Sequence, residues 1–85
     1  MSRIPQLCRT ALLALHDCGG FALPEPTLRQ HVNARDRPPP TDAEFATTIA
    51  TLLQEHCIAA MKGEFGDPNP RWLITEKGEA ALLKH

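Results

Sequence analysis

Residues Thr41 to His56 read TDAEFATTIATLLQEH and have the pattern of one capped amphipathic helix. Thr41 is a favourable N-cap residue, and Glu44 three positions later completes a capping box. The apolar side recurs at three- and four-residue steps over an arc of about 100° and comprises Phe45, Ile49, Leu52, Leu53 and His56. The opposite arc is polar and contains no Lys or Arg. We expect the apolar arc to be buried and the polar arc to face a partner.

A β-hairpin is predicted directly after this helix. Cys57 to Met61 is apolar, Gly66 to Pro70 is dense in turn-forming residues, and Arg71 to Thr75 favours a strand. An isolated hairpin is only marginally stable in water. One face of the hairpin must therefore pack on the helices, and we expect Trp72 to be buried there.

The chain begins with a second strongly amphipathic segment. Apolar residues recur at helical spacing from Ile4 to Cys18, and Gly19-Gly20 supplies a left-handed stop, so we predict a helix from about Pro5 to Asp17. Phe21 to Leu23 is short and apolar. It is either a three-residue edge strand or an extended linker whose Phe21 enters the core.

A shorter helix is predicted from about Glu25 to Ala34, with Leu28 and Val32 on its inner face. Residues Ala34 to Pro40 then read ARDRPPP, and three successive prolines favour an extended, stiff and exposed connector. Helix-turn-helix proteins usually have a turn of three or four residues at this point, so the connector is a departure from that pattern.

Thr75 is placed to cap a last helix from Glu76 to Lys84, whose acidic residues lie near its positive end. The predicted order is therefore helix, short strand, helix, helix, strand, strand, helix. We expect an α+β fold that forms a single domain over residues 1–85. No internal repeat is present.

Residues Trp72 to Gly78, WLITEKG, followed by Leu82 resemble the end of the wing in MarR- and PadR-like winged-helix regulators. In those proteins a strand ends in an apolar-Thr pair, and a Gly three residues later opens the final helix. With the hairpin and the preceding helix, the resemblance covers about a third of the chain. It implies a small winged helix, with a three-helix core, a C-terminal hairpin wing and a final helix. The function it implies is that of the DNA-binding unit of a transcriptional regulator.

Composition and motifs exclude several other classes. No run approaches the roughly 18 apolar residues of a membrane span, and the N-terminus lacks a secretory pattern, so we expect a cytoplasmic protein. The three cysteines have no paired zinc-site spacing and are expected to be buried, reduced thiols, while His56 is expected at the edge of the core. No phosphate loop or catalytic motif is present. We predict no enzyme activity, no metal and no cofactor.

Two partners remain, duplex DNA and another protein. For DNA, hydroxyl and amide groups on the polar arc would contact bases or phosphates, and positive charge would come from the neighbouring segments. The residues predicted for this interface are Arg29, Arg35, Arg37, Thr47, Thr48, Thr51, Gln54, Lys62 and Arg71. The formal net charge of -1 gives no general basic excess. A net charge near zero suits a protein-binding role, as an adaptor, an inhibitor or a homodimer. The candidate contacts for a protein partner are the hairpin edge, Phe65 and Trp72.

Overall fold

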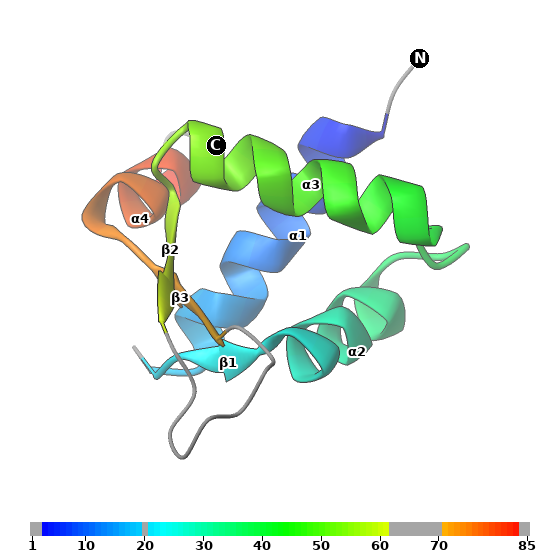
Figure 1. Cartoon of the computed structure of the whole chain (residues 1–85), viewed down its shortest axis with the longest axis horizontal. Coiled ribbons are helices and arrows are strands. Elements are labelled where there is room, and N and C mark those ends of the chain that lie inside the picture. Colours follow the sequence, from blue (N-terminus) through cyan, green and yellow to red (C-terminus); the bar gives the residue numbers. More distant parts are fainter. Residues whose placement is uncertain (1–2, 20, 62–70, 84–85) are drawn as a thin grey trace.

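The computed structural model describes residues 3–19, 21–61 and 71–83. Its elements follow the predicted order (Figure 1). The helices are α1 (Ile4–Asp17), α2 (Glu25–Arg35), α3 (Asp42–Gln54) and α4 (Glu76–Leu83). The strands are β1 (Leu23–Pro24), β2 (Ile58–Met61) and β3 (Arg71–Ile74). The α+β class predicted from the sequence is confirmed.

Helix α1 is the hub of the core. It contacts α2, α3, α4 and β3, and it passes behind α3 in the view of Figure 1. Pro5 lies in its first turn, where a missing N–H breaks no hydrogen bond. After the helix, Gly19 has a φ of 71°, the left-handed geometry expected of a helix stop. The fully buried side chains of α1 include Leu7, Ala11 and Leu15.

Helix α3 begins with the predicted capping box. The Glu44 amide donates to the Thr41 hydroxyl at 3.1 Å, and the Thr41 amide donates to the Glu44 carboxylate at 3.0 Å. Phe45, Ile49 and Leu52 are buried as predicted. Because both reciprocal bonds form, the start of this helix is fixed at its first turn.

The predicted apolar arc extends too far at its C-terminal end. Leu53 is 37% exposed, so its inclusion in the buried arc was wrong. His56 is also exposed, contrary to the expectation of a histidine at the core edge. His56 is exposed because α3 ends at Gln54 and His56 adopts a left-handed φ of 59°, so the chain leaves the helical path before Cys57.

The sheet is antiparallel with strand order β1-β3-β2. Strands β2 and β3 form the predicted pairing, with Ile58 opposite Ile74 and Ala60 opposite Trp72. Trp72 is buried, as expected. The predicted turn from Gly66 to Pro70 lies outside the described residues.

The first strand is displaced from its predicted position. It comprises Leu23 and Pro24, opposite Trp72 and Arg71, instead of residues 21–23. Phe21 is 76% exposed, so the alternative in which it enters the core is wrong. Leu23 packs against the core in its place.

The connector between α2 and α3 is held at both ends. Helix α2 runs through Arg35, one residue beyond the predicted end, and Asp36 is buried and accepts a hydrogen bond from the Gln6 side chain at 2.9 Å. The Arg3 guanidinium donates to the carbonyl oxygens of Pro38 at 2.6 Å and Pro39 at 3.0 Å. The connector is therefore exposed only in its middle, because Pro40 is buried again.

Helix α4 packs against α1 and β3. The Thr75 hydroxyl accepts a hydrogen bond from the Gly78 amide at 3.2 Å, which confirms the predicted cap. Lys84, the predicted last residue of this helix, lies outside the described residues. Among the described helices, none is long and apolar enough to cross a membrane.

Candidate nucleic-acid interface

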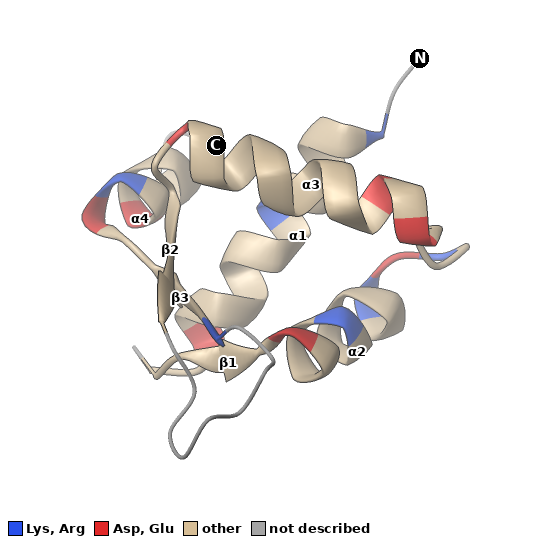
Figure 2. Ribbon diagram, in the orientation of Figure 1, with Lys and Arg blue, Asp and Glu red and all other residues tan. Residues whose placement is uncertain are grey.

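The outward side of α3 is a stripe of small, neutral residues. Ala43, Thr47, Ala50 and Gln54 are all exposed, and their spacing of four, three and four residues places them on one helical face. We call these four residues the α3 stripe. Figure 2 shows no Lys or Arg anywhere along α3. The α3 stripe thus presents alanine methyl groups, one hydroxyl and one amide to the solvent.

Two of the predicted threonines lie off this stripe. Thr48 is 1% exposed, and its hydroxyl donates to the Glu44 carbonyl at 2.8 Å within the helix. Its assignment to the reading face was wrong, because position 48 faces the core between Phe45 and Leu52. Thr51 is half-buried, and its hydroxyl donates to the Thr47 carbonyl at 2.8 Å. Thr47 and Gln54 remain exposed.

The predicted arginines are largely engaged within the protein. Arg29 forms a hydrogen-bonded ion pair with Asp42, and its guanidinium lies 5.6 Å from the centre of the Phe45 ring. The Arg35 guanidinium donates a hydrogen bond at 2.8 Å to the carboxylate of Asp17, the last residue of α1. These contacts use Arg29 to join α2 to α3 and Arg35 to join α2 to α1.

The other three predicted cations differ in their surroundings. Arg37 is exposed in the connector, and no hydrogen bond or ion pair joins it to another described residue. Arg71 is half-buried on β3 opposite Pro24. Lys62 lies outside the described residues. In the described part of the chain, α3 carries acidic residues at its start and no basic residue, so no positive strip runs along this helix (Figure 2).

The acidic residues at the start of α3 are paired with arginines. The Arg3 guanidinium donates to both carboxylate oxygens of Glu44, each at 2.9 Å. These bonds, with a backbone hydrogen bond from Thr41, lower the pKa of Glu44 to about 2. Asp42 is similarly paired with Arg29. The N-terminal end of α3 therefore has little uncompensated negative charge, although Asp42 and Glu44 stand there.

Arg3 and Ala43 were not predicted for this surface, and Ala46 and Ala50, which flank the predicted apolar arc, are exposed like Ala43. The alanine spacing was visible in the sequence, but alanine suits either side of a helix. Their exposure follows only from the packing of Phe45, Ile49 and Leu52 on α1. No local pattern connects Arg3 with Glu44, which lies 41 residues away.

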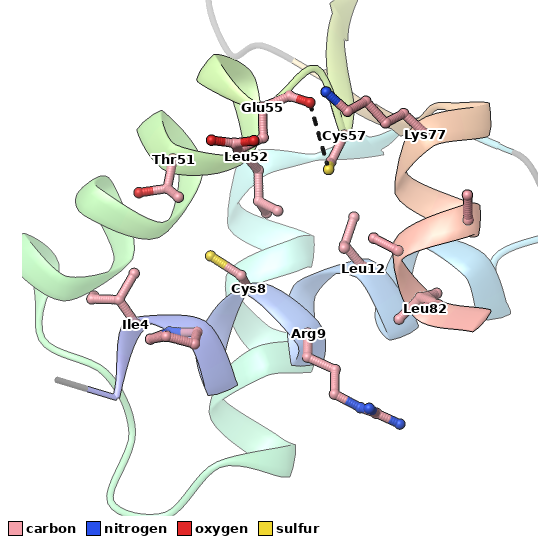
Figure 3. Close-up of a pocket in the computed structure, with 13 residues that line it drawn as sticks. Ile4, Cys8, Arg9, Leu12, Thr51, Leu52, Glu55, Cys57, Lys77 and Leu82 are labelled. Atoms are coloured by element: carbon pink, nitrogen blue, oxygen red, sulfur yellow. Dashed lines mark hydrogen bonds between the residues drawn. The ribbon is translucent and has the colours of Figure 1, made fainter. Parts of the chain in front are cut away.

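A second surface is an apolar groove where α1, the end of α3 and α4 meet (Figure 3). Its volume is about 490 Å³, and its lining includes Cys8, Leu12, Leu52, Cys57, Ala81 and Leu82. Thr51 and Glu55 also line it, so the groove begins beside the C-terminal half of the α3 stripe. Burial raises the pKa of the Cys8 thiol.

The three cysteines are unpaired, but only Cys57 is fully buried. Cys8 and Cys18 are half-buried, so the expectation of three buried thiols was correct for one of them. Among the described residues, no group of three His, Cys, Asp or Glu side chains is arranged to hold a metal ion.

No family model matches the chain, and no curated protein matches it. Among solved structures, the chain is similar to F93 from STIV, which is described as a winged-helix DNA-binding protein. The match has a TM-score of 0.73 and 20% sequence identity, and it covers 99% of this chain and 85% of F93. At this identity the likeness concerns the fold. The element order, the sheet order β1-β3-β2 and this match together show that the chain has the winged-helix fold.

Proposed function

We propose that this protein binds duplex DNA through the outward face of α3. The observation that carries the proposal is the α3 stripe, a capped helix face whose exposed side chains are small and neutral. The major groove of B-DNA is about 12 Å wide and admits an α-helix. Small side chains let the helix backbone approach the base edges closely. F93, which shares the fold, is described as a DNA-binding protein, and this supports the same use of the fold here.

The proposed biological role is that of a cytoplasmic transcriptional regulator, in the manner of the MarR- and PadR-like proteins whose wing motif the chain resembles. Residues 1–85 would act as one DNA-binding domain. We propose no catalytic step, and the α3 stripe contains no group that is suited to one. The phosphate contacts in this proposal come from Arg37 in the connector, from Arg71 and from Lys62.

Salt dependence tests this proposal. Binding of a mixed-sequence duplex should be detectable by fluorescence anisotropy at low salt and should weaken as salt rises, because phosphate contacts release counterions. Since Arg29 and Arg35 are held in ion pairs, we expect only two or three phosphate contacts and a slope of log K against log salt of about −2 to −3. Absence of binding at low salt would overturn the proposal.

Protein binding is the second candidate, and a specific observation favours it. Two of the arginines predicted for the DNA interface, Arg29 and Arg35, are engaged in ion pairs within the fold, while the groove between α1, α3 and α4 exposes apolar surface. Leu83 is 87% exposed on α4. Under this alternative, sedimentation would show a dimer or a complex that persists at high salt, and the anisotropy of labelled duplex would not change.

A further inference from the structure

The chemistry of the α3 stripe limits which base pairs the helix can read. Each base presents a distinct set of groups in the major groove, and side chains are matched to them by hydrogen-bonding geometry. Arg and Lys are matched to guanine, Asp and Glu accept from cytosine, Asn and Gln are matched to adenine, and methyl groups contact the thymine methyl.

The outward face of α3 has no side chain that is matched to guanine. Helix α3 contains no Arg or Lys. Arg29 and Arg3 both reach the first turn of α3, but the Arg29 guanidinium is bound to the Asp42 carboxylate beside the Phe45 ring, and the Arg3 guanidinium is bound to Glu44. The bidentate contact with guanine that an arginine would supply is therefore not provided by α3 or by its immediate neighbour on α2.

The carboxylates that would read cytosine are committed elsewhere. Asp42 binds Arg29, and both oxygens of Glu44 bind Arg3. Glu55 follows the last residue of α3 and lines the groove with α1 and α4 (Figure 3). The α3 stripe thus has no carboxylate of its own to accept a hydrogen bond from cytosine.

The groups that the stripe does present are matched to adenine and thymine. Ala43, Thr47 and Ala50 expose methyl groups over two turns of the helix, and Gln54 continues the same line with an amide. An amide can bond the N6 and N7 positions of adenine, and a methyl group can pack against the 5-methyl of thymine.

We propose that α3 selects A·T base pairs in the major groove, with the methyl groups of Ala43, Thr47 and Ala50 against thymine and Gln54 on adenine. This inference rests on the proposed DNA-binding function. It goes beyond that function because it assigns the base composition of the target and the groove from which it is read. Under this proposal, the thymine methyl group is the main determinant of affinity when duplexes of different base composition are compared.

Replacing thymine by uracil tests the proposal, because it removes that methyl group and leaves base pairing and the minor-groove acceptors in place. Anisotropy titrations would compare an alternating A·T duplex, its uracil counterpart and a G·C duplex at one low salt concentration. We expect the thymine duplex to bind about fivefold or more tightly than the other two, the low end of discrimination by base contacts. A G·C duplex with 5-methylcytosine should regain affinity, since its methyl group lies at the thymine position.

A pair of glutamine variants locates the effect. Gln54→Ala should reduce the preference for A·T over G·C duplex, whereas Gln30→Ala, at an exposed glutamine of α2, should leave it unchanged. Equal binding of the thymine, uracil and G·C duplexes would overturn this inference and leave the DNA-binding function standing. Failure of every duplex to bind would overturn both.

Discussion

Glu44 shows how one side chain serves several purposes in this fold. It completes the capping box of α3, binds Arg3 from the start of α1 and, through Arg3, is connected to the carbonyl oxygens of Pro38 and Pro39. The capping role was predictable from the spacing of Thr41 and Glu44. The pairing with Arg3 was not, because it depends on how α1 and α3 cross.

This residue gives a pH-dependent prediction. The folded pKa of Glu44 is lowered from 4.5 to about 2, chiefly by the hydrogen bonds from Arg3. A lowered pKa stabilises the fold above the unfolded value and loses that effect as the pH falls through the folded value. Glu44→Gln should therefore lower the Tm at pH 7, and the difference from the unsubstituted protein should be much smaller at pH 2, where the Glu44 carboxyl is about half protonated in the fold.

Thermal unfolding followed by circular dichroism at both pH values measures this. Glu55→Gln is the matched control, because Glu55 lies just after the same helix and its carboxylate has no hydrogen bond or ion pair with another described residue. The Cys57 thiol donates to the Glu55 backbone carbonyl, which the substitution leaves in place. It should leave the Tm nearly unchanged at pH 7. An unchanged Tm for Glu44→Gln at pH 7 would show that the Arg3–Glu44 pair contributes nothing to stability.

At the scale of elements, the sequence predicted the helices and the hairpin better than their ends. The long periodic patterns of α1 and α3 and the capping residues Thr41 and Thr75 carry strong local signals. The displaced strand β1 and the early end of α3 at Gln54 depend on pairing and packing with distant segments. Thr48 was misplaced for the same reason, since only the orientation of α3 on α1 decides which polar positions are buried.

The contact between α4 and the start of β2 gives a second stability prediction. A Cβ atom at Gly78 would lie 2.3 Å from the Cys57 carbonyl oxygen and 2.8 Å from the Ile74 side chain. Gly78→Ala must therefore move α4 away from the sheet, and we expect a cost of about 1–3 kcal/mol. Chemical denaturation measures it. The neighbouring exposed substitution Lys77→Ala should stay within about 0.5 kcal/mol, and an equal effect of the two would contradict the close approach.

At the scale of the whole molecule, the core and the sheet determine the fold, whereas the distribution of charge determines which residues are available to contact DNA. The winged-helix fold follows from the core and the sheet, and the sequence motif at Trp72 to Gly78 indicated it. The predicted basic residues were identified as sources of phosphate contacts, but Arg29 and Arg35 bind Asp42 and Asp17 across 13 and 18 residues. No local sequence pattern indicates such long-range ion pairs. The number of arginines available for phosphate contacts was therefore not predictable from residue types.

The central claim is that the α3 stripe contacts duplex DNA, and one pair of variants tests it most directly. Ala50→Glu places a negative charge in the middle of the stripe, while Ala80→Glu makes the same change at an exposed alanine of α4, which lines the groove with α1. Both variants would first be shown by circular dichroism to fold. In anisotropy titrations of the alternating A·T duplex at low salt, we expect Ala50→Glu to weaken binding about tenfold or more, a loss of ~1.4 kcal/mol, and Ala80→Glu to bind like the unsubstituted protein. Equal affinity of Ala50→Glu and the unsubstituted protein would contradict the account.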